Sequence, residues 1–216
     1  LARPVEETRD PHGVVLMNGL NSNRSILIEG NNLDLIPGAP IISTWFLDPP
    51  YNIGYDYRNG FDDKMSNEEY VSYLVDVLSL CWERSPEGAS LFFMHFPEDA
   101  ARMLNQLEES GWKMHQWITW TYPGHTFGHN TRFRRGSRAI IWFTKGKPYF
   151  ESRATVQPYR DPNDLRIKKQ IEKGVLGAIH LDHWNINQVK GGTEEHRYTT
   201  QVPQELLQRI ILHTTK

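Results

Sequence analysis

Predominantly apolar runs and amphipathic stretches alternate through the middle of this chain. The runs "IISTWFL" at 41–47, "SLFFMHF" at 90–96 and "RAIIWFT" at 138–144 are short and dominated by apolar side chains. Continuous runs of this length are typical of strands that are buried on both faces of a parallel sheet. We therefore expect three core strands at these positions.

Stretches with helical periodicity lie between and after these runs. A capping-box pattern at 66–69 precedes apolar residues that recur at helical spacing over 70–81. Pro97 opens a second amphipathic stretch, which Gly111 ends, and 202–213 forms a third. This alternation predicts an α/β fold with a doubly wound, mostly parallel sheet that is flanked by helices.

The remaining segments have weaker patterns. Residues 1–24 are polar, with scattered glycine and asparagine, and predict a lead-in without regular structure. A β-rich run at 25–30 and one helical turn at 31–36 follow. The run at 112–120 predicts a strand, joined to the third apolar run by a loop rich in glycine and arginine. At 151–200 the pattern weakens, which predicts an irregular region or a small inserted subdomain.

Composition restricts the class of protein. Of 216 residues, 38% are hydrophobic and 23% are charged, which is typical of a globular domain with a core of its own. The single cysteine, Cys81, cannot form an internal disulfide and lies within the apolar helical stretch. His125 and His129 lack an accompanying carboxylate or thiol, so we expect no metal site. No apolar run is long enough to span a membrane, and we expect a cytoplasmic protein.

Charge is distributed unevenly along the chain. The formal net charge is −2, yet residues 110–150 contain no aspartate or glutamate. This span carries seven basic residues: Lys113, Arg132, Arg134, Arg135, Arg138, Lys145 and Lys147. A local excess of positive charge in an otherwise acidic chain indicates a polyanionic partner. A solvated hairpin tip is the alternative explanation.

The stretch "WFLDPPYN" at 45–52 places an acid, two prolines and a tyrosine directly after a predicted core strand. Proline stiffens this corner and has no N–H of its own. Asp48 and the Pro49 carbonyl can therefore accept both protons of an amino group, which turns its lone pair away from an aromatic ring. Tyr51 can stack on a nucleobase that has been flipped out of a duplex. The alternative is a strand-terminating turn with a surface tyrosine.

The longer stretch "LDPPYNIGYDYRNGFDD" resembles the catalytic motif of DNA methyltransferases that transfer methyl from S-adenosylmethionine to base amino groups. In the similar subgroup this motif precedes the target-recognition region. "ILIEGNNLDLI", "RAIIWFTKG" and the stretch up to "QELLQRII" are similar to further family segments in the same order. The resemblance implies a Rossmann-like, circularly permuted catalytic domain at 25–216, with a target-recognition region at about 121–190.

The resemblance also implies the site residues. The catalytic corner would comprise Asp48, Pro49, Pro50 and Tyr51. Binding of S-adenosylmethionine would involve Asn31, Asp48, Thr200, Gln201 and Pro203. Double-stranded DNA would contact Arg132, Arg134, Arg135 and Arg138. An aspartate at the start of the motif favours the N6 amino group of adenine, with the N4 amino group of cytosine as the alternative. A homodimer is left open.

Three departures from the family pattern favour a second hypothesis. Asn31 stands where the family usually has an acid, and Val202 stands where it usually has lysine. The glycine-rich cofactor loop expected shortly after residue 213 is not within the sequence. A DNA-binding protein that has this fold but no methyl transfer is therefore the alternative from another functional class.

Overall fold

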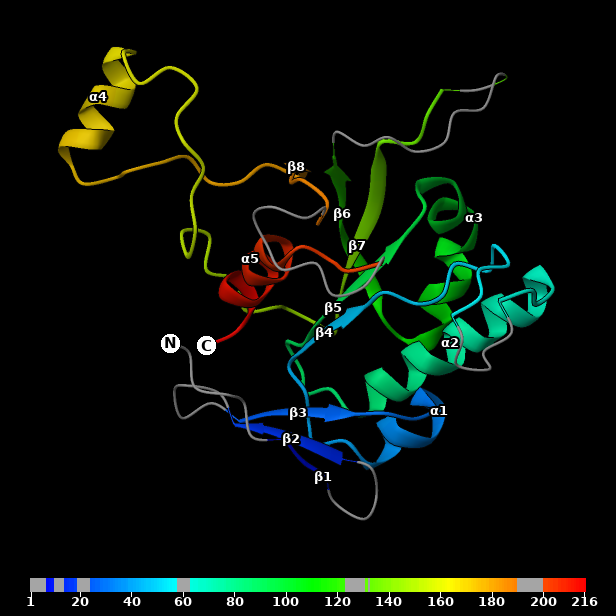
Figure 1. The fold of residues 1–216 in the computed structure, drawn as a ribbon. Coiled ribbons are helices and arrows are strands. Elements are labelled where there is room, and N and C mark those ends of the chain that lie inside the picture. The colour runs from blue at the N-terminus through cyan, green and yellow to red at the C-terminus, as the bar shows by residue number, and fades with distance from the viewer. Residues whose placement is uncertain are drawn as a thin grey trace. The chain divides into compact units, whose positions relative to one another are not determined.

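Figure 1 shows the computed structural model of the chain, which describes residues 7–9, 14–18, 24–57, 63–122, 131, 133–189 and 200–216. The chain divides into two compact units, residues 1–39 and residues 40–216. The second unit contains the predicted catalytic corner and the predicted alternation of strands and helices.

Three antiparallel strands open the first unit. The elements of this unit are β1 (Glu7–Arg9), β2 (Val14–Asn18), β3 (Arg24–Ile28), α1 (Asn32–Leu35) and the 3-10 helix η1 (Ile36–Gly38). The predicted strand at 25–30 and helical turn at 31–36 are confirmed. β1 and β2 lie where the sequence predicted no regular structure. Antiparallel pairing explains the difference, because neighbouring strands satisfy each other's backbone groups even where the side chains show no clear pattern.

A five-stranded sheet with the order β4-β5-β7-β6-β8 forms the centre of the second unit. Its strands are β4 (Thr44–Leu47), β5 (Ser90–His95), β6 (Lys113–Thr121), β7 (Ser137–Thr144) and β8 (His183–Asn185). β4 is parallel to β5, and β6 is parallel to β8, whereas β7 is antiparallel to β5 and β6. Four of these described strands therefore share one direction. The predicted α/β fold with a mostly parallel sheet is confirmed.

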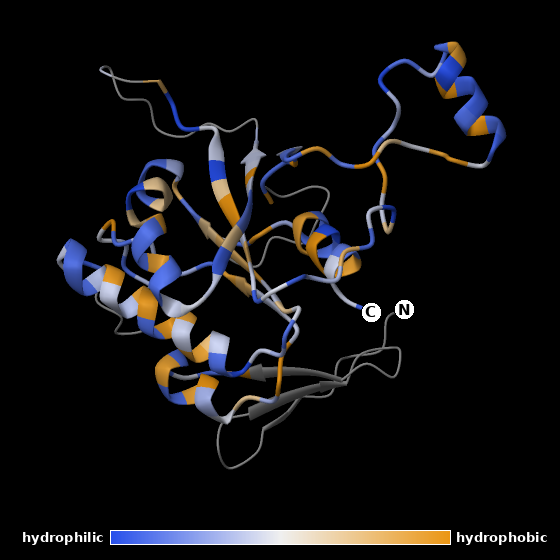
Figure 2. Cartoon of the chain, turned by 180° about the vertical axis from the view of Figure 1, so that it is seen from behind, coloured by the Kyte–Doolittle hydropathy of each residue, from blue (hydrophilic) through white to orange (hydrophobic). Residues whose placement is uncertain are grey.

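Helices cover both faces of this sheet, as Figures 1 and 2 show from opposite sides. On one face lie α2 (Asn67–Glu83) and α3 (Pro97–Leu107), and on the other lies α5 (Gln204–Thr214). Successive side chains of a strand point to opposite faces of the sheet. Phe92 and Trp142 therefore pack in the same cluster as Leu206 of α5, while Phe93, the next residue after Phe92, points to the other face. Within the described ranges, no helix is both long and apolar enough to cross a membrane.

The predicted start of α2 and the predicted stop after α3 are both present. Ser66 Oγ accepts from the Glu69 backbone N–H at 3.2 Å, and the Glu69 carboxylate accepts from the Ser66 N–H at 2.9 Å. After α3 and the 3-10 helix η2 (Glu108–Ser110), Gly111 has a φ of 102°. A Cβ atom at this position would lie 2.9 Å from the Trp82 ring, so glycine is required there.

Between β7 and β8 the chain makes a long excursion that contains α4 (Leu165–Glu172). This helix stands apart from the sheet in both views (Figures 1 and 2). Leu165, the first residue of α4, is 76% exposed, and Leu176, a few residues after its end, is 78% exposed. The sequence predicted an irregular region here because no apolar periodicity indicates burial. The Asp164 carboxylate nevertheless caps the helix by accepting from the Arg166 N–H at 2.8 Å.

Candidate active site

The predicted corner, Asp48 to Tyr51, lies where the parallel strands β4 and β5 end. A cleft of about 700 Å³ opens at this edge of the sheet. Its lining includes Asp48, Pro49, Pro50, Tyr51, Phe96, Trp120, Arg138, Thr200, Gln201 and Val202. In open α/β sheets, ligands bind beyond the carboxyl ends of the strands, and this volume is typical of small-molecule sites.

The Tyr51 ring is fixed on several sides. It lies 4.4 Å from the His95 ring and meets Phe96 edge-on at 4.7 Å, measured between ring centroids. The Arg138 guanidinium lies 5.5 Å from the centroid of the same ring. The Tyr51 hydroxyl also hydrogen bonds to the Asp48 side chain. Asp48 and Tyr51 are therefore direct neighbours beside an open cleft and are not packed into closed apolar material.

The Asp48 carboxyl has an unusual ionisation. Burial raises its pKa to about 6, while the hydrogen bond from Tyr51 and the positive charge of Arg138 lower the pKa and partly offset this effect. The carboxyl is nevertheless reached by solvent from the open side of the cleft, with protein on its other sides. Burial and the neighbouring Asp48 raise the pKa of Tyr51, which stays a neutral hydrogen-bond donor. At neutral pH, Asp48 is an anionic acceptor that faces the cleft.

Two buried side chains that sequence reasoning missed, Tyr70 and His95, support Pro50: Tyr70 contacts Pro50 directly, and His95 contacts Tyr70. The Tyr70 hydroxyl donates to the Pro50 carbonyl at 2.5 Å and lies 3.0 Å from His95 Nε2. Tyr70 fits the apolar stripe of α2, so its spacing predicts only a core residue. His95 gives a clearer signal, because this polar residue directly follows the apolar residues 91–94 of a buried strand. Within the described part of the chain, the Pro49 carbonyl has no hydrogen-bond partner.

The loop that follows the corner is fixed by the Asp63 carboxylate, which is only 4% exposed. It accepts backbone N–H groups from Asn52 at 2.8 Å, Ile53 at 3.0 Å and Tyr55 at 2.8 Å. Asn52 has a φ of 54°, and its side chain exchanges two hydrogen bonds with the backbone of Met65. Sequence reasoning missed Asp63 and Asn52, since nothing in the loop pattern distinguishes a buried acid from a solvated one.

The predicted DNA-binding arginines occupy different environments. Arg138 lines the cleft, stacks 4.5 Å from the Phe96 ring and donates to the Tyr122 hydroxyl. Arg135 lies 3.7 Å from the same ring and pairs with Glu98 at 3.4 Å. Arg134 is exposed. Arg132 lies outside the described residues, as do His125 and His129.

The predicted cofactor residues divide between the two units. Thr200 and Gln201 line the cleft beside Asp48. Pro203 is buried and precedes the first residue of α5. Asn31 belongs to the first unit, where its side chain caps α1 by accepting from the Leu33 N–H at 3.1 Å. The second unit therefore brings Thr200 and Gln201 together with the predicted catalytic corner.

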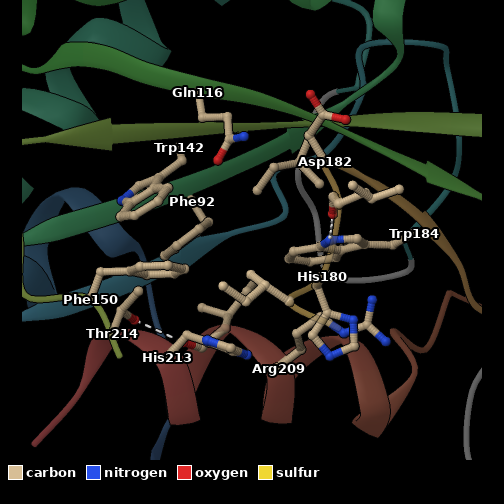
Figure 3. A pocket seen from close by; sticks show the side chains of 14 residues that line it. Phe92, Gln116, Trp142, Phe150, His180, Asp182, Trp184, Arg209, His213 and Thr214 are labelled. Atoms are coloured by element: carbon tan, nitrogen blue, oxygen red, sulfur yellow. Dashed lines mark hydrogen bonds between the residues drawn. The ribbon is translucent and has the colours of Figure 1, made fainter. Parts of the chain in front are cut away.

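A second pocket lies between α5 and the sheet (Figure 3). Phe92 and Trp142 from the sheet face His213 and Thr214 from α5. Its free volume is about 60 Å³, which holds a few water molecules but not a nucleoside. The cleft beside Asp48 is therefore the candidate active site.

Comparisons with known proteins agree with this geometry. The chain is 27% identical over 220 residues to the Type II methyltransferase M.BglII of Bacillus subtilis, which covers 93% of this chain and 56% of that protein. It is 28% identical over 197 residues to the Type II methyltransferase M.HpaI of Haemophilus parainfluenzae, which covers 86% and 54%. The chain thus spans about half the length of the curated relatives it matches.

Solved structures support the fold. The cytosine-N4-specific PvuII DNA methyltransferase superposes with a TM-score of 0.64 at 13% identity, covering 88% of this chain and 70% of that one. The Thermus thermophilus protein TTHA0409, complexed with S-adenosyl-L-methionine, superposes with a TM-score of 0.50 at 14% identity, covering 85% and 71%. A family model described as DNA methylase, for the N6 and N4 amino-group enzymes, matches residues 42–216. The chain therefore belongs to this family of DNA methylases.

Proposed function

We propose that this chain forms the catalytic region of a DNA methyltransferase that modifies an exocyclic amino group. The N6 amino group of adenine is the favoured acceptor, and the N4 amino group of cytosine is the alternative. One observation carries the proposal: Asp48 and Tyr51 lie side by side at a stiff corner that faces a cleft of about 700 Å³. Membership of the DNA methylase family supports the reaction class.

The corner would act on the amino group through two acceptors. The Asp48 carboxylate and the Pro49 carbonyl would each accept one amino N–H, so that the nitrogen lone pair leaves the plane of the base. Positive charge that develops on this nitrogen would be stabilised by the adjacent carboxylate, which is in place before the reaction. The Arg138 guanidinium lies against the Tyr51 and Phe96 rings. Because of this position, we propose that Arg138 contacts the flipped base and not the DNA backbone.

The residues of the cleft also fit the proposed cofactor. S-adenosylmethionine supplies an electrophilic methyl group when it is bound. The cleft extends from Asp48 to Thr200 and Gln201, whose hydroxyl and amide groups can hold the polar parts of the donor. TTHA0409 binds this molecule on a similar fold. The role of Asn31 at the cofactor stays a prediction.

Duplex DNA is the proposed substrate. Arg134 would contact phosphate from its exposed position, and Arg135 would do so nearer the cleft. The excursion that carries α4 falls within the predicted target-recognition region at 121–190, a boundary that stays a prediction together with the homodimer. The names of M.BglII and M.HpaI identify those relatives as Type II methyltransferases and support a modification role.

Transfer of a tritiated methyl group tests the proposal directly. Full-length protein is incubated with labelled S-adenosylmethionine and mixed-sequence duplex DNA, and the DNA is then digested to nucleosides. Label in N6-methyladenine supports the favoured acceptor, and label in N4-methylcytosine replaces it with the alternative. Calorimetric titration with the donor distinguishes a methyltransferase from the alternative, a DNA-binding protein of the same fold without methyl transfer. Neither transfer nor donor binding by a folded protein would overturn the proposed activity.

A further inference from the structure

We infer that Tyr70 and His95 are positioning residues that hold the corner in its reactive shape through the Pro50 carbonyl. The inference rests on the proposed methyl transfer and assigns a role to two buried residues beneath the cleft. Neither side chain lines the cleft. Both would therefore act through the corner and would not touch the base or the donor.

The hydrogen-bond directions follow from the available protons. A backbone carbonyl only accepts, so the Tyr70 hydroxyl donates its single proton to the Pro50 carbonyl at 2.5 Å. The 3.0 Å contact between the hydroxyl and His95 Nε2 therefore requires the imidazole to donate. This fixes His95 as the tautomer with a proton on Nε2 and a bare Nδ1. Burial is the dominant cause that lowers the pKa of His95 to about 4. The charge of Asp99 and the Phe96 backbone raise the pKa and offset part of this effect, the charges of Arg138 and Arg135 lower it further, and the ring is neutral.

This chain of bonds controls two parts of the corner together. The Pro50 carbonyl shares a planar peptide unit with the Tyr51 nitrogen, so fixing the carbonyl also fixes the backbone entry to Tyr51. The His95 ring that donates into the chain also packs 4.4 Å from the Tyr51 ring. In addition, the Pro50 carbonyl is occupied by Tyr70, which leaves the Pro49 carbonyl to accept an amino proton beside Asp48.

Fold stability alone does not explain a histidine at position 95. The residue is 1% exposed at the end of an apolar strand, and its Nδ1 is buried without a hydrogen-bond partner among the described residues. A buried unsatisfied nitrogen destabilises the folded state, and an apolar residue would remove it. The bonded nitrogen, Nε2, instead contacts the Tyr70 hydroxyl, which donates to the Pro50 carbonyl of the corner.

The test uses full-length protein with matched variants. Tyr70→Phe removes only the hydroxyl, and His95→Leu removes the donor. His95→Gln places an amide N–H near the position of Nε2 and tests rescue. Ser79→Ala is the control, because this hydroxyl on the same helix as Tyr70 also donates to a backbone carbonyl, that of Val75 at 2.8 Å, but lies outside the cleft.

We expect Tyr70→Phe and His95→Leu to lower kcat about tenfold to a hundredfold, with the KM for DNA and for donor within about twofold. Loss of position affects the reacting geometry more than the binding of either substrate. The double variant should be no slower than the slower single variant, since both break one chain of bonds. His95→Gln should stay within about threefold of the unmodified protein, as should Ser79→Ala. Thermal melts confirm that each variant is folded.

Two outcomes would overturn the inference. One is an unchanged kcat for Tyr70→Phe, and the other is a loss in His95→Gln as large as that in His95→Leu. Imidazole ¹⁵N chemical shifts supply a readout that needs no activity: they should show a protonated Nε2 that shifts in Tyr70→Phe. If the unmodified protein transfers no methyl group to any DNA, the proposed function fails. The tautomer measurement still decides whether the bonded chain exists, and a proton on Nδ1 would refute it.

Discussion

The corner at 48–51 and the basic segment at 133–138 lie at the same edge of the sheet but are held in opposite ways. The corner is fixed by the hydrogen bond of Tyr70 and by ring contacts of Tyr51, and the loop directly after it is fixed by hydrogen bonds to Asp63. The basic segment begins with Phe133, which is fully exposed at 101%, and its first anchored side chain among the described residues is Arg135, which contacts Phe96 and Glu98 shortly before β7 begins.

This difference separates two physical tasks. Alignment of an amino group needs acceptors that are in place before the reaction, because reorganisation during the reaction would raise its barrier. Attraction of a polyanion needs charges that stay in solvent, where they can displace counterions from phosphate. Changes at the corner should therefore reduce kcat, whereas changes at the exposed tip should alter DNA affinity and its dependence on salt.

The largest expected effect is that of Asp48→Ala. Removal of this carboxylate eliminates one amino acceptor and the charge that stabilises the reacting nitrogen, so kcat should fall by about a thousandfold or more. DNA affinity should stay nearly unchanged, because the basic segment is intact. Single-turnover transfer and duplex titrations measure the two quantities. Asp76→Ala, an exposed carboxylate change on α2, is the control. Activity within tenfold of the unmodified protein would remove Asp48 from the proposed role.

The corner could be located from sequence because its features are local. An acid, two prolines and an aromatic ring follow a core strand within eight residues, and the flanking apolar runs mark β4, β5 and β7. Its support could not be predicted in the same way. Tyr70 is 20 residues from Pro50, and Asp63 is 11 residues from Asn52. A tyrosine in an apolar stripe has the same spacing whether or not its hydroxyl is bonded.

A smaller effect is expected when the support of the corner is weakened by Asp63→Asn. An amide has one acceptor oxygen in place of two and turns an NH2 group towards backbone N–H groups that need an acceptor. Loss of charge-assisted bonds to Ile53 and Tyr55 should lower the free energy of unfolding by about 3 kcal/mol. Chemical denaturation measures this value, with Asp76→Asn as control. An unchanged free energy would show that the loop is fixed by other contacts.

Titration of Asp48 should make the rate of transfer fall by about tenfold for each pH unit below the pKa of its carboxyl. The pKa of Asp48 is raised to about 6, so the carboxylate acceptor is present above this pH and is lost as the pH falls through it. We therefore expect kcat/KM to fall below about pH 6. Because the charge of Arg138 lowers the pKa of Asp48, Arg138→Gln should move this limb to higher pH, and Arg138→Lys should leave it in place.

Rates measured from pH 4.5 to 8 under single-turnover conditions decide this prediction. Thermal melts over the same range are needed, since loss of the fold at low pH would produce a similar decline. An acid limb centred near the ordinary aspartate value of about 4 would contradict the raised pKa. A limb that stays in place in Arg138→Gln would show that the guanidinium does not influence Asp48.

The smallest effect is expected at the exposed tip. Arg134→Ala removes one solvent-exposed charge, so duplex affinity should fall a few-fold and the slope of log affinity against log salt should decrease by about 1. Arg135→Ala should change the slope less, because its guanidinium already pairs with Glu98 and stacks on Phe96. Arg102→Ala on α3 is the control for net charge. Equal salt slopes for all three variants would show that the exposed tip makes no phosphate contact of its own. A larger change in kcat than in DNA affinity would mean that this segment also positions the base.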